Sequence, residues 1–336
     1  MVTFLSGGTG TPKLLWGLES VFDPATVTVV ANTGDDVEIG GLHVSPDVDS
    51  VLFERSNRMD RETWWGIEGD TTVTNDGLAT LAAEMSIDSE PVYLSAERQI
   101  AGPRLGQWRR FRGVPEFMTL GDRDRAVHIA RTARLQAGES LTTVTAALAH
   151  AFDIEATVLP MSDDPVATLI HTPTGVQHFQ AFWVARAGEP PVDDVEFRGA
   201  ETATPAPGVT QALSEPVIVG PANPVTSLGP LVAIDAIEES LHSVPVVAVS
   251  PFVGRTAFSG PAGKLMRAVG ADPSTRGMAA EQPWIDVFVV DDADDELPDR
   301  PVVRTDTKIE TRADARRVLE TCCEALDAYT SCSNLG

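Results

Sequence analysis

Short runs of apolar, largely β-branched residues recur along the chain. They lie at residues 2–5, 26–31, 156–159, 216–219, 244–249 and 284–290. Between them lie segments with the 3.6-residue period of an amphipathic helix, at residues 12–20, 46–55, 75–85, 123–136, 141–152, 231–241, 260–269 and 311–329. Strands that are apolar on both faces and alternate with helices are typical of a parallel sheet covered on both sides. The pattern therefore predicts an α/β fold with a doubly wound parallel sheet.

Two segments interrupt this alternation and are predicted to be insertions. Residues 165–200 contain two strands of alternating polarity around Pro173-Thr174-Gly175, which predicts a β-hairpin. Residues 86–117 are rich in arginine within an otherwise acidic chain (Arg98, Arg104, Arg109, Arg110 and Arg112). This second segment is either a solvated loop or a cationic lid over an anionic substrate. We expect a single domain, residues 1–336, with its core at residues 1–85 and 118–300 and with a smaller inserted α/β region.

The charge balance indicates the environment in which the protein works. The chain has 49 acidic residues against 25 lysines and arginines, which gives a net charge of −24. Only Lys13, Lys264 and Lys308 are lysines. Such a charge destabilises a compact chain by self-repulsion unless salt screens it. The composition therefore indicates a halophilic protein, and it disfavours nucleic-acid binding over the general surface because phosphate neutralisation needs clustered cations.

The sequence gives no sign of export or of membrane insertion. No segment approaches the roughly 20 consecutive apolar residues of a membrane span, and the chain starts directly with a predicted strand, so we expect a cytoplasmic protein. Cys322, Cys323 and Cys332 form no metal-binding or disulfide pattern.

A glycine-rich loop follows the first predicted strand. It reads "SGGTGTPK" from Ser6 to Lys13 and matches neither the dinucleotide fingerprint nor the P-loop. Glycines still let the backbone approach an anion, and free N–H groups at a helix start can hold it. The alternative is a simple tight turn. Because "NTGDD" and "GPANPVTSLGP" follow two further strands, and ligands of parallel sheets bind beyond the carboxyl ends of the strands, we predict a polyanion site.

Four carboxylates lie near this predicted anion site. Asp35 and Asp36 follow the second strand, and Asp47 and Asp49 occupy "SPDVDS" at the start of a predicted helix. Acidic residues in a first helical turn are favourable for the helix dipole alone. Beside a phosphate, however, they would repel the ligand unless a cation intervened, and magnesium is usually held by carboxylate and phosphate oxygens together. We therefore predict a Mg²⁺–diphosphate site.

No constellation for covalent catalysis stands out in the sequence. Phosphoryl transfer needs only positioning and charge neutralisation, and Lys13 and Arg123 are the candidate cations. Arg123 lies in "LGDRDRAVHIARTARL", where the alternative is that Asp122 caps the helix and Arg123 is solvated.

Taken together, these loops resemble the CofD family, the 2-phospho-L-lactate transferases of deazaflavin coenzyme F-420 biosynthesis. The matching stretches run in family order from residue 4 to about residue 270 and include "SGGTGTPKLLWGL", "NTGDD", "SPDVDS", "WWGIEGDTTVT", "LGDRDRAVHIARTARL", "PMSDDP", "GPANPVTSLGP" and "SPFVGRTAFSGPAGKLM". The resemblance implies a Rossmann-like core, magnesium dependence and a homodimer. It also implies transfer of 2-phospho-L-lactate (or phosphoenolpyruvate) from a guanosine-diphosphate-activated donor to the deazaflavin Fo, giving (dehydro) coenzyme F-420-0 and GMP.

The resemblance also assigns expected roles by position. Asp49 would be catalytic and would contact Fo together with Arg123, while Asp35, Asp36 and Asp49 would lie near the metal. The expected contacts to the donor phosphates or nucleotide are Gly7, Gly8, Thr9, Gly10, Lys13, Asn32, Asn223, Thr226 and Ser227.

Two other functions compete with this interpretation. The related YvcK-type proteins bind nucleotide-sugars and act in regulation. They share the glycine loop but lack the combination of "NTGDD", "SPDVD" and "LGDRDRA" found here. A nicotinamide-dependent oxidoreductase is disfavoured by the missing dinucleotide fingerprint.

Overall fold

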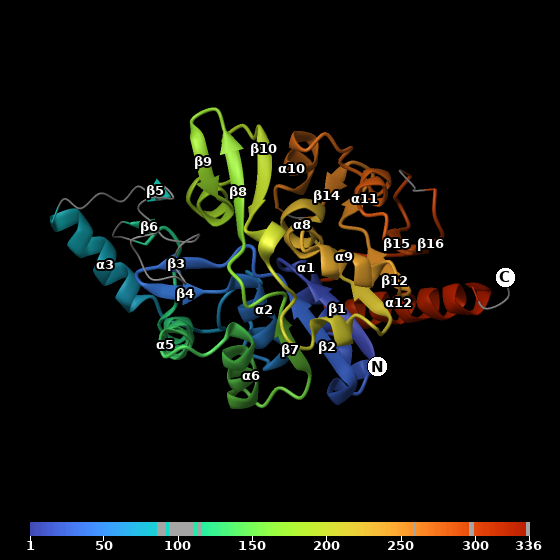
Figure 1. The fold of residues 1–336 in the computed structure, drawn as a ribbon, viewed down its shortest axis with the longest axis horizontal. Coiled ribbons are helices and arrows are strands. Elements are labelled where there is room, and N and C mark those ends of the chain that lie inside the picture. Colours follow the sequence, from blue (N-terminus) through green and yellow to red (C-terminus); the bar gives the residue numbers. More distant parts are fainter. Residues whose placement is uncertain (86–91, 94–110, 113–115, 259, 296–298, 334–336) are drawn as a thin grey trace.

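The computed structural model describes residues 1–85, 92–93, 111–112, 116–258, 260–295 and 299–333. Its centre is a seven-stranded sheet in the order β16-β15-β12-β11-β1-β2-β7, in which all neighbours are parallel (Figure 1). The strands are β1 (Val2–Ser6), β2 (Val27–Ala31), β7 (Thr157–Pro160), β11 (Val217–Val219), β12 (Val246–Val249), β15 (Val287–Asp291) and β16 (Val302–Thr305). This confirms the predicted α/β fold, a Rossmann-like parallel sheet with helices on both faces.

Alternate residues of each strand pack into two separate cores. Phe4 and Val29 face a core shared with α1 (Gly10–Leu15), α2 (Pro46–Arg55), α6 (Leu141–Ala151) and α12 (Arg312–Ser333). Leu5 and Val30 face the other core, which is covered by α7 (Val209–Ala212), α8 (Gly229–Val232), α9 (Asp235–Leu241), α10 (Ala262–Ala268) and α11 (Thr275–Glu281). Burial on both faces explains why these strands are continuous apolar runs.

The strand order reverses at β1. The chain passes from β1 to β2 on one side, and it later returns to place β11 on the other side of β1. Parallel sheets bind ligands in the crevice at such a switch point. The glycine-rich loop after β1 and the loop after β11 therefore meet at the same edge, although more than 200 residues separate them in the sequence.

Several predicted elements differ in their bounds. The helix expected at residues 12–20 is the shorter α1 followed by a 3₁₀ turn, Leu18–Ser20, because Gly17 packs directly against the backbone of α12 at Arg316. The helix expected at residues 231–241 is divided into α8 and α9 and is preceded by a π-helix, Pro224–Leu228. The pattern missed α11, β16 and the hairpin of β3 (Val37–Ile39) and β4 (Leu42–Val44), which are short or of mixed polarity.

A second, three-stranded sheet lies beside the central one. β8 (Ala167–Thr172) pairs antiparallel with β9 (Gly175–His178) and with β10 (Asp194–Arg198). Figure 1 shows this sheet rising above the central sheet, between the β3–β4 hairpin and α10. A π-helix, Ala181–Ala185, follows β9.

The remaining described elements frame these two sheets. Two helices, α3 (Val73–Glu84) and α5 (Asp122–Gln136), flank the β3–β4 hairpin in Figure 1, and two small hairpins complete the fold, β5 (Val92–Tyr93) with β6 (Phe111–Arg112) and β13 (Phe252–Val253) with β14 (Thr256–Ala257). Most of the arginine-rich segment at residues 86–117 lies outside the described residues, and the division into core and insertions stays a prediction.

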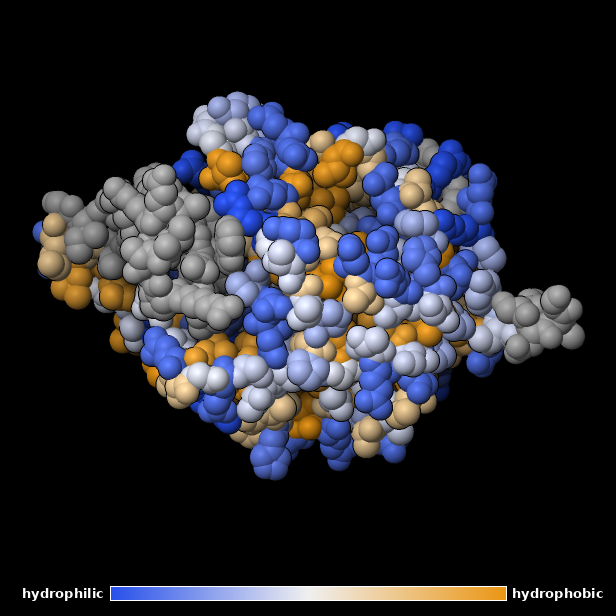
Figure 2. Space-filling view, viewed as in Figure 1, coloured by the Kyte–Doolittle hydropathy of each residue, from blue (hydrophilic) through white to orange (hydrophobic). Residues whose placement is uncertain are grey.

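Hydrophilic residues cover much of the face seen in Figure 2. Within the described ranges, none of the helices combines the length and the apolar character that a membrane crossing requires.

Candidate active site

Glycines allow the loops after β1 and β11 to touch. A Cβ atom at Gly7 would lie 2.5 Å from Ser227 Cβ, and one at Gly10 would collide with the Pro221 carbonyl oxygen. Gly8 has a φ of +62°, a conformation that glycine adopts without strain. Gly7 and Gly10 are therefore required by close contact with the β11 loop, and Gly8 by its backbone conformation.

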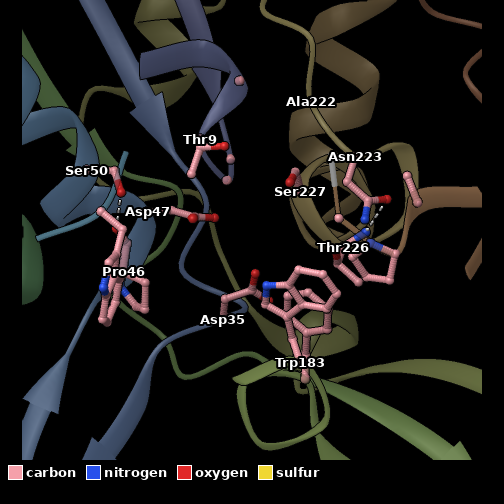
Figure 3. A pocket seen from close by; sticks show the side chains of 18 of the residues that line it. Thr9, Asp35, Pro46, Asp47, Ser50, Trp183, Ala222, Asn223, Thr226 and Ser227 are labelled. Atoms are coloured by element: carbon pink, nitrogen blue, oxygen red, sulfur yellow. Dashed lines mark hydrogen bonds between the residues drawn. The ribbon is translucent and has the colours of Figure 1, made fainter. Parts of the chain in front are cut away.

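A cavity of about 550 Å³ opens at this junction (Figure 3). It brings together most of the residues predicted to bind the donor and one of the predicted metal ligands. These are Gly7, Gly8, Thr9, Gly10, Asn223, Thr226, Ser227 and Asp35. The remaining described lining residues are Pro46, Asp47, Ser50, Thr63, Trp65, Thr119, Phe179, Gln180, Trp183, Val184, Pro221, Ala222, Pro251, Gly260, Pro261 and Ala262.

Asp35 and Asp47 are the carboxylates of this cavity, and both are buried. Asp47 Oδ2 accepts a hydrogen bond of 2.9 Å from Asn32 Nδ2, whereas Asp35 Oδ1 has no hydrogen-bond partner among the described residues. Burial raises the pKa of Asp47 to about 7. Burial, followed by the charge of Asp47, also raises the pKa of Asp35 well above its ordinary value. The cavity therefore holds two carboxylates whose charge no described cation neutralises.

Asn32 and Asp36 lie behind the cavity and not in its described lining. Asn32 is fully buried and binds Asp47 and the Thr226 carbonyl oxygen (3.3 Å), so it joins the β2 loop to the β11 segment. Asp36 accepts a hydrogen bond of 2.6 Å from Ser45 Oγ and lies 3.0 Å from His43 Nε2. These contacts fix the β3–β4 hairpin and the start of α2, and they position Asp47.

Asp49 lies in a different environment from Asp47, although both belong to the first turn of α2. Its two carboxylate oxygens pair with the fully buried guanidinium of Arg131, Oδ2 at 3.1 Å from Nη1 and Oδ1 with Nη2. His128 Nδ1 lies 3.6 Å from Asp49 Oδ2, and His128 Nε2 lies 3.0 Å from Asp124 Oδ1. Burial alone would lower the pKa of Arg131, but the charge and hydrogen bonds of Asp49 outweigh it and raise that pKa.

Asp49, Asp124 and His128 offer ligand atoms within 4.8 Å of one another, and no other group of three with this spacing exists in the described part of the chain. They line a small cavity of about 10 Å³, which shares Pro46, Ser50 and Trp65 with the large one. Asp49 thus adjoins the main cavity and does not line it. Asp124, His128 and Arg131 were missed as site residues. Their spacing of four and then three residues, which places polar side chains on one inward face of α5, was the available signal.

The structure places the two predicted cations outside the described lining of the main cavity. Lys13 is half-buried, its Nζ lies 5.5 Å from the centre of the Trp64 ring, and burial lowers its pKa. Arg123 is exposed at a separate cavity of about 470 Å³, together with Arg58 and Phe152.

Asp122 caps a different helix from the one considered in the sequence. Its carboxylate accepts the N–H groups of Val73 and Thr74 at the start of α3. Asp70, in turn, accepts the N–H groups of Arg123 and Asp124 at the start of α5. Asp122, the first residue of α5, thus caps α3, and Asp70, which precedes α3, caps α5. This mutual capping fixes the position of α5 and of Arg131, which belongs to it.

Sequence comparison identifies the family to which this site belongs. The family model described as "2-phospho-L-lactate transferase CofD" matches residues 2–330. The chain belongs to the CofD family. It is 58% identical over 318 residues to the 2-phospho-L-lactate transferase of Haloarcula marismortui, covering 95% of this chain and 96% of the relative. It is 57% identical over 330 residues to that of Halobacterium salinarum, covering 98% of each.

Membership of the CofD family agrees with the acidic composition, since both of these relatives come from haloarchaea. A crystal structure of a UPF0052-family protein from Bacillus halodurans superimposes with a TM-score of 0.58 over 96% of this chain and 98% of that one, at 12% identity. That likeness shows a shared fold only.

Proposed function

We propose that this CofD-family protein transfers the 2-phospho-L-lactate (or phosphoenolpyruvate) group from a guanosine-diphosphate-activated donor to the deazaflavin Fo. In this reaction a hydroxyl oxygen of Fo forms a bond to the phosphorus that carries the lactyl group and loses its proton to solvent, while the bond from that phosphorus to the oxygen of GMP breaks and GMP leaves. The observation that carries the proposal is the cavity at the switch point, where an amide-rich loop faces two uncompensated carboxylates in a chain that belongs to this family.

The donor would bind along the two loops that meet in the cavity. The loop from Gly7 to Gly10 supplies backbone N–H groups, and Thr226 and Ser227 supply hydroxyls, which together suit a diphosphate. The side-chain oxygen of Asn223 already caps the following π-helix through the N–H groups of Val225 and Thr226. We therefore propose that Asn223 shapes this loop and that Thr226 and Ser227 contact the donor.

Asp35 and Asp47 are the residues that we propose to hold Mg²⁺. The residues fit such an ion because Asp35 Oδ1 is buried without a described partner and because both carboxylates have raised pKa values. Carboxylate pairs combined with substrate phosphates are the usual magnesium site. Magnesium, when bound, supplies positive charge that neutralises the diphosphate. Asp36 and Asp49, the other two predicted ligands, lie behind the cavity, and their metal contacts stay a prediction.

For the acceptor we propose that Asp49 orients the attacking hydroxyl. Its position in the small cavity, which shares Pro46 and Ser50 with the main one, supports this role, and its pairing with Arg131 fixes the carboxylate in place. Contact between Arg123 and Fo stays a prediction, since Arg123 lies at the second cavity. A homodimer also stays a prediction, supported by the family resemblance and tested by light scattering in high salt.

The decisive experiment combines purified protein, Fo, the guanylylated donor and Mg²⁺ in high salt. We expect release of GMP together with a phospholactylated deazaflavin, and no release when Fo or Mg²⁺ is omitted. Absence of product with both the phospholactate and the phosphoenolpyruvate donor would contradict the proposal.

A further inference from the structure

The main cavity has an aromatic wall that none of the phosphate chemistry uses. Trp183 lines it, and its side chain is 39% exposed, which makes it the only tryptophan among the exposed large hydrophobic residues of the described chain. Figure 3 shows the indole directed into the cavity from the side opposite Thr9, with Asp35 between them. A large apolar side chain kept open to solvent inside a binding cavity points to a ligand that covers it.

The local backbone holds this indole in a defined position. Trp183 lies in the π-helix Ala181–Ala185, an uncommon geometry that often occurs at functional sites. The turn that follows contains two consecutive left-handed residues, Ala187 (φ +51°) and Gly188 (φ +66°), and the Gly188 N–H bonds to the Phe182 carbonyl oxygen at 2.9 Å. A Cβ atom at Gly188 would lie 3.1 Å from the Trp183 ring. The ring therefore rests against a residue that has no side chain.

Lys264 connects this turn to α10, which also contributes to the lining of the cavity. Its Nζ donates to the carbonyl oxygens of Gly188 (2.7 Å) and Glu189 (2.9 Å) and lies 5.6 Å from the centre of the Phe182 ring. Lys264 belongs to α10, whose first residue, Ala262, lines the same cavity. It is also one of only three lysines in the chain. A compact ammonium group can reach two neighbouring carbonyl oxygens, whereas the planar guanidinium of arginine is wider.

We propose that Trp183 stacks on the planar heteroaromatic ring of a substrate, with Lys264 as the positioning residue for this platform. An anionic phospholactyl group gains nothing from an indole face, which carries the negative part of the ring quadrupole, so a ring is the better match. This inference rests on the proposed function, which offers two such rings, the guanine of the donor and the deazaflavin of the acceptor.

Separate titrations of GDP and Fo identify the stacked ring. We expect Trp183→Leu to weaken binding of one of the two compounds by about tenfold, the usual scale for loss of one base–aromatic stack, and to leave the other within twofold. Trp183→Phe should restore most of the affinity. Val176→Ala in β9, the strand that precedes the π-helix of Trp183, serves as a control, because Val176 is exposed and is absent from the described lining of the cavity. Quenching of tryptophan fluorescence by the stacked ligand should be weaker in both Trp183 variants, with the remainder coming from Trp65 in the same cavity.

Lys264→Met and Gly188→Ala test the positioning role. Both should raise the KM for the same substrate that Trp183→Leu affects while kcat changes less than threefold, and Lys264→Arg should not restore the wild-type KM. Unfolding midpoints of all variants show whether the fold is retained.

The outcomes separate the two proposals. A wild-type protein that binds neither GDP nor Fo would overturn the proposed function and this inference with it. Wild-type binding of both compounds, with unchanged affinities in folded Trp183→Leu, would overturn the stacking inference alone. An increase in KM for one substrate in Lys264→Met but for the other in Trp183→Leu would overturn the positioning role.

Discussion

Asp49 and the pair of Asp35 and Asp47 are buried carboxylates at or near the start of α2. The sequence does not distinguish them, but their surroundings in the structure differ. Asp49 is buried against the guanidinium of Arg131 and lies near His128, so its charge is compensated. Asp35 and Asp47 are equally buried, but the described residues around them offer neutral partners, such as the Asn32 amide that donates to Asp47, and no paired cation. A helix turn thus directs Asp47 into the main cavity and Asp49 toward α5.

This difference assigns different tasks to the two groups. Buried charges are stable only when paired, neutralised or bound to a metal. The Asp49–Arg131 pair meets this requirement within the protein, so its main contribution is a fixed geometry. The charges of Asp35 and Asp47 have no such partner within the described protein, and a bound cation would neutralise them. The following predictions test this contrast, starting with the largest expected effect.

Removal of the buried cation should be the most damaging change. Arg131→Met leaves Asp49 buried without its partner, and breaking a buried ion pair from one side costs about 3–5 kcal/mol. We expect a loss of that size in the free energy of unfolding, measured by denaturant titration at constant high salt.

The matched control is Arg134→Gln on the same helix. Arg134 pairs with Glu139 at the surface, where both side chains are more than one-third exposed, and solvent and salt screening leave such pairs little influence on stability. Similar losses in the two variants would show that the Asp49–Arg131 pair is not compensated in the way described here.

Substitution in the cavity should affect activity and stability in opposite directions. Asp47→Asn removes one proposed Mg²⁺ ligand, and we expect turnover to fall by about a hundredfold, equivalent to about 2.7 kcal/mol of barrier. Without Mg²⁺, the same variant should melt at a higher temperature than the wild type at pH 8, because an uncompensated buried charge is removed. A variant with normal Mg²⁺-dependent turnover would remove Asp47 from the proposed site.

A smaller effect is expected from adding a side chain at the contact between the loop after β1 and the loop after β11. Gly10→Ala places a Cβ atom against the Pro221 carbonyl oxygen, and such overpacking costs about 1–3 kcal/mol. We also expect a higher KM for the donor, since the loop must move. Gly77→Ala in α3 is the control, because no atom lies within 4 Å of the added Cβ, and it should stabilise the helix slightly. An unchanged donor KM in Gly10→Ala would contradict the placement of the diphosphate at this junction.

The contrast also shows what the sequence could predict. The apolar runs predicted six of the seven strands of the central sheet, because strands buried on both faces leave a clear pattern, and the loop residues at their ends followed from the topology. Asp47 and Asp49 could not be separated, since their difference depends on Arg131, which is 82 residues away in the sequence. Trp183 was missed for a similar reason, because it lies in a local π-helix next to a turn that binds the distant Lys264, and neither feature has a periodic signal.

The pH dependence of stability should also separate the two groups of carboxylates. The folded protein holds the proton of Asp47 more tightly than the unfolded chain, with a pKa of about 7 against an ordinary value of 3.8. Its protonation therefore contributes stability that is complete below the ordinary value and is lost as the pH rises toward 7. Other carboxylates titrate in the same range, so the quantity to measure is the melting temperature of the wild type minus that of Asp47→Asn. Without Mg²⁺, this difference should fall by a few degrees between pH 5 and pH 8. Saturating Mg²⁺ should reduce the fall, because a cation binds the charged form. A difference that stays constant with pH would mean that Asp47 is compensated in the folded protein, as Asp49 is.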